Sequence, residues 1–289
     1  MEKLHFTDTE VLEGLALAHP ELISYENNMV LSRALADAAR VTVVAMSCSG
    51  HEPALAGFVG PGLADIAVVG NSEAAPGPSL VLQALQLADK GQGSLLVVLN
   101  NAGDILTSNI VLHQAELRGL QVARVIVHDD KTAAAETEWQ QGCLGVLPVL
   151  KLAGAAAARG MSLAEVLSVA EGCAEHEASV KLTFTPETTA ESLSAVGLEP
   201  LLEALQPQEQ DELLFLVNGN GSLSSRAQLA LLYNCHAKLL QRGFAVRSCA
   251  AADFFTGQED AYVQLCLVRL SLEEAELWEA SCRSAYFNK

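Results

Sequence analysis

The sequence predicts an α/β protein of two α/β domains, the first with a doubly wound, mainly parallel sheet and the second smaller and mixed. Three observations lead to this expectation. The 289 residues, 50% of them hydrophobic, suffice for one large domain or two modest ones. From residue 41 onward, short apolar runs alternate with longer stretches of helical periodicity. The runs are nearly free of polar residues, which is typical of strands covered by helices on both faces.

Four strands and two crossover helices are expected in the first domain. The helical stretches place apolar residues at i, i+3, i+4 and i+7, and such connections between strands favour a parallel sheet. The expected strands are 41–46, 66–70, 94–100 and 121–127, and the expected helices are 79–89 and 105–117. Two further helices close the domain: the Ala- and Leu-rich stretch 148–160, and one that begins at a capping box of Ser162 and Glu165.

A second, mixed α/β domain of roughly a hundred residues is expected to follow the first. The boundary is predicted near 174–179, which gives domains of residues 1–176 and 177–289. The expected elements are strands at 180–184, 212–218 and 262–270 and helices at 191–205, 224–241 and 272–280.

Charge and composition exclude several classes of partner. Seventeen Lys and Arg against 35 Asp and Glu give a net charge of −18, which repels phosphate backbones and anionic lipids, so we expect neither nucleic acid nor membrane as a partner. The apolar runs are shorter than the roughly 20 residues that cross a bilayer. The first 20 residues contain no basic segment before an apolar one, so a cytoplasmic location is expected. Seven dispersed cysteines without a C-x-x-C pair argue against disulfides and zinc.

Candidate site residues follow the strands, because ligands of open parallel sheets bind beyond the carboxyl ends of the strands. The loops of interest are 47–53, 70–78 and 100–104. His51 and Asp104 are predicted to lie at neighbouring strand ends, where they could move hydroxyl protons. The alternative is structural: Asp104 caps a helix that begins at Ile105, and His51 is a buried, hydrogen-bonded imidazole.

Two other motifs are weaker. His128 is followed by Asp129 and Asp130, but one imidazole and two adjacent carboxylates that point in different directions form a poor cage, so no metal site is expected. The segment 218–222 precedes a helix as a phosphate cradle would. It lacks the P-loop lysine and the spacing of a dinucleotide fingerprint, so a plain turn is expected.

Residues 49–54 (SGHEPA) followed by 56–60 (AGFVG) resemble the signature of the substrate-binding subunit of dihydroxyacetone kinases. The similarity extends over nearly the whole chain from about residue 25. Other stretches that resemble this family are 100–104, 142–160, 216–220, 242–243 and 252–256.

This resemblance implies a homodimeric protein that presents a small keto-sugar or polyol to a separate nucleotide-binding kinase subunit. The chain itself would bind no cofactor, and ATP or ADP with Mg would be held by the partner. In this family a histidine of the second domain attacks the ketone and forms a covalent hemiaminal. A first-domain histidine and an aspartate engage the hydroxyls, and the aspartate serves as the base.

Transferred residue by residue, the resemblance assigns the catalytic roles to His51 and Asp104. The family's binding lysine falls on Leu99, its glycine on Cys48 and its nucleophilic histidine on Thr183. A threonine without a nearby base forms at most a reversible hemiketal, so stable covalent capture should fail. The implied substrate-binding residues are Ser49, Gly50, His51, Asn101, Gly103, Asp104 and Thr183.

Two further departures concern the surroundings of the site. Leu99 and Phe184 are expected to make the pocket more apolar, which penalises a polyhydroxyl ligand left with unpaired groups. The chain between Pro186 and Leu213 is shorter than the resemblance implies, so a lid over the site is expected to be trimmed.

Two functions therefore stay open. The first is a subunit of glycerone and glycerol metabolism that binds a small carbonyl or polyol non-covalently and is an active phosphotransferase only together with a nucleotide-binding partner. The alternative is a non-catalytic paralogue that acts as a sensor, a coregulator or a docking protein. A nucleotide-cofactor dehydrogenase ranks last, because no G-x-G-x-x-G follows a strand.

Overall fold

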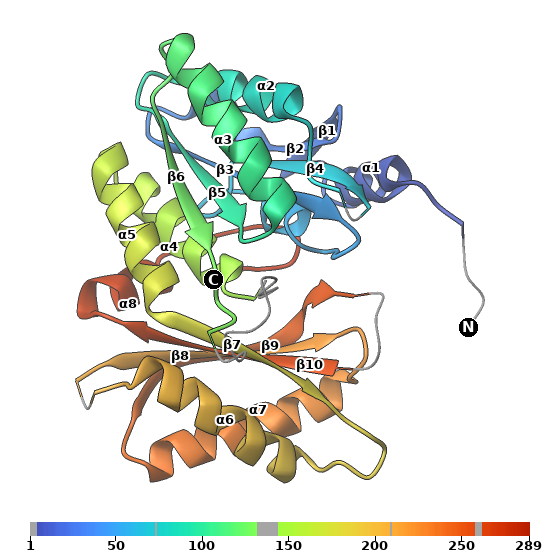
Figure 1. Cartoon of the computed structure of the whole chain (residues 1–289), viewed down its shortest axis with the longest axis vertical. Helices are drawn as coiled ribbons and strands as arrows, with labels where there is room; N and C mark the ends of the chain where they lie inside the picture. Colours follow the sequence, from blue (N-terminus) through green and yellow to red (C-terminus); the bar gives the residue numbers. More distant parts are fainter. Residues whose placement is uncertain (1–4, 73, 132–143, 209, 258–261) are drawn as a thin grey trace.

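The chain forms two stacked α/β layers in the computed structural model, which describes residues 5–72, 74–131, 144–208, 210–257 and 262–289 (Figure 1). The first layer contains a six-stranded sheet and the second a four-stranded sheet. The expected fold class is confirmed.

The first sheet is parallel except at one edge. Its strands follow the order β1-β2-β4-β3-β5-β6. The central strand β3 runs parallel to β4 and β5, and β5 runs parallel to β6, whereas β2 pairs antiparallel with β4 and with β1. The carboxyl ends of the parallel strands point toward the second layer (Figure 1). The bounds are β1 Ile23–Glu26, β2 Met29–Ser32, β3 Thr42–Ser49, β4 Ile66–Ser72, β5 Ser94–Leu99 and β6 Val122–Val127.

Helices cover both faces of this sheet, as its apolar strands require. Alternate residues of β3 divide between the faces: Val44 and Met46 pack in one buried cluster with α2 and α3, and Val43 and Ala45 pack in another with α4 and α5. The helices are α2 Pro78–Ala88, α3 Ala102–Leu117, α4 Val146–Ala158 and α5 Leu163–Glu175.

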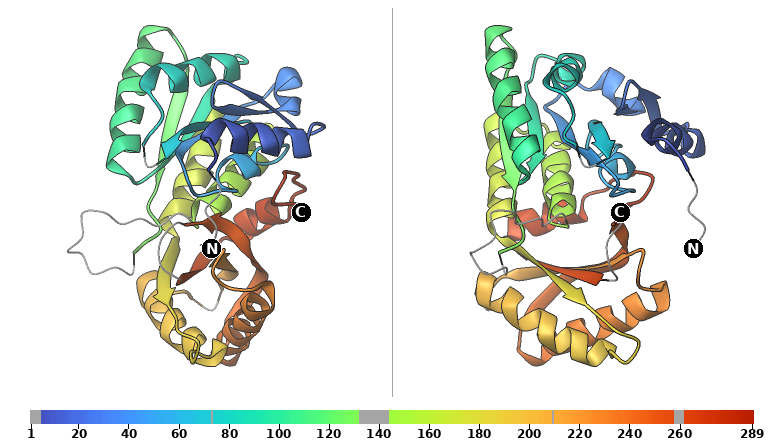
Figure 2. Two further views of the ribbon diagram at one scale, coloured as in Figure 1. Left: turned by 90° about the vertical axis from the view of Figure 1, so that its right-hand side faces the viewer. Right: turned by 45° about the vertical axis from the view of Figure 1, so that its right-hand side comes forward.

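The second sheet has the order β7-β10-β8-β9, in which β8 and β9 are parallel and β10 is antiparallel to both of its neighbours. Figure 2 shows helices α6 and α7 on one face of this sheet and the first layer on the other. The bounds are β7 Glu177–Thr183, α6 Ala190–Leu205, β8 Glu212–Asn220, α7 Ser225–Gln241, β9 Ala245–Thr256, β10 Tyr262–Leu270 and α8 Leu272–Glu279.

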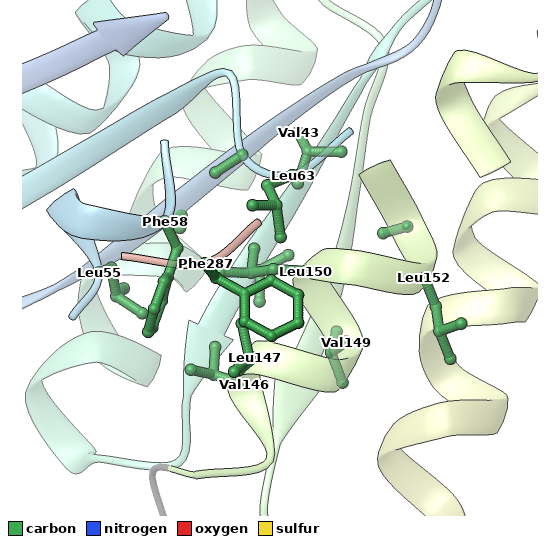
Figure 3. Close-up of a cluster of buried hydrophobic side chains, with 14 of the residues drawn as sticks. Val43, Leu55, Phe58, Leu63, Val146, Leu147, Val149, Leu150, Leu152 and Phe287 are labelled. Atoms are coloured by element: carbon green, nitrogen blue, oxygen red, sulfur yellow. The ribbon is translucent and has the colours of Figure 1, made fainter. Parts of the chain in front are cut away.

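The C-terminal residues return to the first layer. Phe287 is buried beside Leu147 and Leu150 of α4 (Figure 3). The Arg283 amide donates to the Pro61 carbonyl at 2.9 Å. One buried cluster thus includes side chains of the first sheet, of α4, of the second sheet and of the C-terminal tail. The predicted boundary between the two domains, after residue 176, coincides with the start of β7. Both predicted domains contribute to this buried core, and their independence stays a prediction.

Several elements were not expected from the sequence. Helix α1 (Asp8–Ala18) begins with a capping box of Thr7 and Glu10. The hairpin of β1 and β2 has only four residues in each strand, too few for a clear period. Strand β9 is an edge strand, and exposed and half-buried residues alternate in its first half. Among the described residues, no helix is long and apolar enough to cross a membrane.

Candidate functional site

The loop after β3 is held at the carboxyl edge of the first sheet by Asp8, the first residue of α1. The hydroxyl of Ser49 donates to Asp8 Oδ1 at 2.8 Å, and the Ser72 amide donates to Asp8 Oδ2 at 3.3 Å. One carboxylate thus connects the ends of the neighbouring strands β3 and β4. Sequence reasoning missed this role for Asp8, because its partners lie more than 40 residues away along the chain.

Gly50 starts the turn that presents His51. Its φ of +98° lies in a region that residues with a side chain rarely adopt. Its amide donates to both carboxylate oxygens of Glu52, at 3.1 and 3.2 Å, so Glu52 closes the turn instead of pointing into solvent. His51, at the tip of this turn, is half-buried. The structural alternative, a buried and hydrogen-bonded imidazole, is therefore wrong as to burial.

Asp104 is the buried carboxyl of the site, with 2% of its surface exposed. The Asn101 side-chain amide donates to Asp104 Oδ2 at 3.1 Å, while Oδ1 is buried without a hydrogen-bond partner among the described residues. Burial raises the pKa of Asp104 to about 6, against the opposing effects of Asn101 and of the nearby Ser47 hydroxyl. Asp104 is therefore a carboxylate at neutral pH with an unused acceptor and an affinity for a proton, which suits a general base.

The structural alternative for Asp104 is wrong. Helix α3 begins at Ala102, not at Ile105, and its cap position is Asn101, which makes no capping hydrogen bond with its side chain. Asp104 lies within the first turn of α3, where the helix dipole favours a negative charge.

The loops after β3, β4 and β5 converge, as predicted. A Cβ at Gly103 would lie 3.2 Å from the Cβ of Ala75, in the loop after β4, so glycine permits this close approach. Burial raises the pKa of the Cys48 thiol, and the charges of Asp104 and then Glu52 raise it further, whereas a contact with Ser47 lowers it. Cys48 therefore lies within electrostatic reach of both carboxylates.

The second sheet contacts the His51 loop directly. The hydroxyl of Thr256, at the end of β9, donates to the Glu52 carbonyl at 2.6 Å, and the Thr256 amide donates to the His51 carbonyl at 3.4 Å. The carbonyl of the candidate histidine and that of the residue after it are thus held by a residue of the other layer. The site consequently lies between the two sheets.

Thr183 ends β7 at the same end of the second sheet. It is exposed and pairs with Tyr262 of β10. Two residues earlier in β7, Lys181 places its Nζ 3.9 Å from the centre of the Tyr262 ring. Phe184 packs against the cluster between this sheet and α6 and α7, so the expectation that it makes the pocket more apolar is wrong. Leu99 is buried at the end of β5, in the core shared by the two layers.

Asn220 is a polar residue of this region that sequence reasoning missed. Only 2% of its surface is exposed, and neither Oδ1 nor Nδ2 has a hydrogen-bond partner among the described residues. A Cβ at Gly257 would lie 3.3 and 3.4 Å from these two atoms and 2.8 Å from the hydroxyl oxygen of Tyr262. The side chains of Asn220 and Tyr262 therefore both lie next to Gly257. The φ of +55° at Asn220 fits the expected turn, because asparagine tolerates this conformation.

Other candidate groups do not join this site. His128 is exposed, whereas the carboxylate of Asp129 is buried and accepts a hydrogen bond from the Gly145 amide at 2.8 Å. No group of three or more potential metal ligands occurs in the part of the chain that the structure describes. A surface hollow lined by residues of α5, β10 and the start of α8 lies at the other end of β10. The six described cysteines are free, and Cys143 lies outside the described residues.

Comparisons with known proteins agree with this architecture. A dihydroxyacetone-binding subunit DhaK of Listeria innocua, from a PTS-dependent dihydroxyacetone kinase, is 27% identical over 315 residues, which cover 96% of this chain and 95% of that protein. The subunit DhaK of a PEP-dependent dihydroxyacetone kinase of Escherichia coli is 34% identical over 172 residues, 57% of this chain and 46% of that protein.

A solved structure described as "regulation of the Dha operon of Lactococcus lactis" superposes with a TM-score of 0.91 at 20% identity and covers 100% of this chain and 98% of that one. At this identity the likeness establishes the fold alone. Residues 13–195, more than half of the chain, match the family described as the Dak1 domain. The chain therefore belongs to the Dak1 domain family.

Proposed function

We propose that this chain is a dihydroxyacetone-binding type of subunit that holds a small hydroxyketone, hydroxyaldehyde or polyol non-covalently between its two sheets. A hydroxyl of the ligand would then be phosphorylated by a separate nucleotide-bearing subunit that carries ATP or ADP with Mg. The observation that carries the proposal is the carboxylate of Asp104. It is buried at the carboxyl edge of the first sheet, and one of its oxygens has no hydrogen-bond partner in the described part of the chain.

Asp104 can accept the proton of a ligand hydroxyl. A pKa of about 6 leaves it ionised at pH 7, yet more basic than an ordinary aspartate. Phosphoryl transfer depends mainly on positioning and charge stabilisation, so a subunit without a nucleotide contributes by orienting and activating the hydroxyl. His51, in the adjacent loop, is proposed to bind a second hydroxyl, with Ser49, Gly50, Asn101 and Gly103 shaping this part of the site.

Binding is proposed to be weak and reversible. Thr183 lies at the position that the family resemblance assigns to the nucleophile, and its side chain is exposed at the end of β7. A triose has about six heavy atoms, and even the best small ligands gain no more than about 1.5 kcal/mol from each, so losing a covalent bond and a lysine removes much of the available affinity. The proposed homodimer and the cytoplasmic location stay predictions.

A second candidate function is that of a non-catalytic coregulator or docking subunit. The observation that favours it is again Thr183, together with Leu99 at the position assigned to the binding lysine, because both replacements weaken capture of a substrate. Such a protein would bind its protein partner with or without a triose.

Titration calorimetry with dihydroxyacetone, glyceraldehyde, erythrulose and glycerol tests the first function, followed by phosphorylation with a nucleotide-bearing partner subunit. We expect millimolar binding of at least one hydroxyketone, its loss in Asp104→Asn, and no covalent adduct by mass spectrometry. Thr183→His should gain an adduct. If the unmodified chain binds no ligand and supports no turnover, while a pull-down recovers a regulator, the second function is correct.

A further inference from the structure

We propose that the carboxamide of Asn220 forms the hydroxyl-binding group of the second sheet, opposite Asp104. Its Nδ2 would donate to one oxygen of the ligand, and its Oδ1 would accept a hydrogen bond from a neighbouring hydroxyl. This inference rests on the proposed function, because it names the group that holds the same ligand from the second layer.

The first argument is the state of the carboxamide itself. Buried side-chain amides nearly always have hydrogen-bond partners, since burial removes those that water would supply. Asn220 is 2% exposed, yet both of its polar atoms lack a partner among the described residues. Its neighbour Asn218, equally buried, shows the usual situation. Asn218 accepts from the amides of Phe254 and Phe255 at 2.9 and 3.1 Å and donates to Gln264 at 3.1 Å.

The second argument is position. Asn220 pairs with Thr256 across the parallel strands β8 and β9, and the Thr256 hydroxyl binds the backbone of the His51 loop. On the other side, the hydroxyl of Tyr262 and the carboxamide of Asn220 both approach Gly257, and Tyr262 pairs with Thr183. Within the second sheet, Asn220 therefore lies between Thr256, which contacts the His51 loop, and Thr183, which occupies the position assigned to the nucleophile.

The third argument is chemical. An amide is both donor and acceptor, as is a pair of neighbouring hydroxyls or a hydroxyl beside a carbonyl. A neutral ligand suits this site, because Asp104 and Glu52 lie close to Cys48 on the facing loop and a net charge of −18 opposes anions. The inferred ligand class is thus a short, uncharged hydroxyketone or polyol held by Asp104 on one side and Asn220 on the other.

The test is titration calorimetry of Asn220→Gly with dihydroxyacetone and with hydroxyacetone, which lacks one hydroxyl. Glycine keeps the positive φ without strain and removes the amide. The matched control is Asn27→Gly, because Asn27 also has a positive φ, 49°, but is exposed in the turn between β1 and β2. Thermal unfolding of both variants checks that they fold.

We expect Asn220→Gly to weaken dihydroxyacetone binding at least tenfold and hydroxyacetone binding less, with Asn27→Gly unchanged. Equal affinity of the two variants for dihydroxyacetone would overturn the role of Asn220 while the proposed function stands, provided that Asp104→Asn still abolishes binding. An equal loss of affinity for both ligands would also overturn it, because the amide would then not bind the hydroxyl that hydroxyacetone lacks. If the unmodified chain binds neither ligand, the proposed function and this inference both fail.

Discussion

Two buried aspartates on the first sheet have opposite surroundings. Asp65 precedes β4 at the amino edge of the parallel strands and is fully buried. It accepts two hydrogen bonds from the Arg40 guanidinium, at 2.8 and 2.9 Å, and one from the Val43 amide at 2.9 Å. Asp104, at the carboxyl edge, accepts a hydrogen bond from the Asn101 side chain, and its Oδ1 has no hydrogen-bond partner among the described residues.

The difference separates a structural carboxylate from one available to a ligand. At the amino edge, the protein supplies every partner of the buried charge, so nothing remains for another molecule to bind. At the carboxyl edge, the protein leaves an acceptor unused, and this is the edge where ligands of open parallel sheets bind. Burial alone therefore does not mark a functional carboxylate. Buried oxygens of Asp129 and Glu177 also lack a hydrogen-bond partner among the described residues, and Asp104 differs from them by its place beside the loop after β3.

Removing the partner of Asp65 should have the largest effect on stability. Arg40→Ala leaves a fully buried carboxylate without its guanidinium, which is expected to lower the free energy of unfolding by about 3–5 kcal/mol. Urea denaturation measures it. The control is Arg159→Ala, since Arg159 forms only an exposed ion pair with Glu276 at 3.8 Å and its loss should cost less than about 1 kcal/mol. Similar losses of unfolding free energy in Arg40→Ala and Arg159→Ala would contradict the structural role assigned to Asp65 at the amino edge.

Asp104→Asn should have the opposite profile: loss of function without loss of stability. Phosphorylation with a partner subunit is expected to fall by about 100-fold, the usual contribution of a general base. In the unmodified chain, turnover should rise with pH through about 6 as Asp104 ionises. A pH profile without this rise in turnover would show that Asp104 is not the base.

The stability of the same variant, relative to the unmodified chain, should depend on pH. The pKa of Asp104 is raised in the folded state from 3.8 to about 6, so its contribution to stability is fully present below pH 4 and is lost as pH rises through 6. The asparagine side chain of the variant carries no such charge. Asp104→Asn should therefore be more stable than the unmodified chain at pH 8, by about 1–3 kcal/mol, and similar to it at pH 4. Denaturation at both pH values measures this.

A second pair of buried carboxyls, Asp129 and Glu177, extends the comparison. Burial raises the pKa of both groups, and the charge of Asp129 raises that of Glu177 further, while Lys131 opposes it. These two groups therefore stabilise the folded state at low pH, and their contribution to stability is lost as pH rises above about 4. Glu177→Gln in an Asp104→Asn background should therefore lose less stability than the Asp104→Asn variant alone as pH rises from 5 to 9. An unchanged pH dependence would show that Glu177 does not titrate in this range.

The smallest expected effect concerns the contact between the two layers. Thr256→Val removes the hydrogen bond to the Glu52 carbonyl and is expected to cost about 1 kcal/mol of stability. Ligand affinity should fall a few-fold, because the His51 loop loses a support. Thr256→Ser keeps the hydroxyl and is the control. If Thr256→Val and Thr256→Ser bind the ligand with the same affinity in calorimetry, the hydroxyl does not position this loop.

The sequence predicted the parts of the fold that show a clear period. The apolar runs of β3, β4 and β5 are buried on both faces, so each is recognisable without its neighbours. The sequence does not predict β9, an edge strand, because exposed and half-buried residues alternate in its first half and Arg247, Ser248 and Asp253 interrupt its apolar residues. The start of α3 was placed three residues late, because Ala102 and Gly103 precede its first periodic apolar residue.

The candidate site was predictable only where it follows strands. His51 and Asp104 come directly after β3 and β5, and strand order alone brings their loops together. The contributions of Asp8 and Thr256 depend on hydrogen bonds between residues far apart in sequence. Asn220 occurs in a turn motif that the sequence marks, but its unpaired amide becomes visible only when burial and partners are known. The expected pocket role of Phe184 failed because this residue, directly after β7, packs against the cluster that contains α6 and α7.

The return of Phe287 to the core of the first layer has a consequence for synthesis of the protein. While a nascent chain is still emerging from the ribosome, Leu147 and Leu150 of α4 lack the aromatic ring that covers them in the finished molecule (Figure 3). The amino-terminal half can thus reach its final packing only after translation has passed the second sheet.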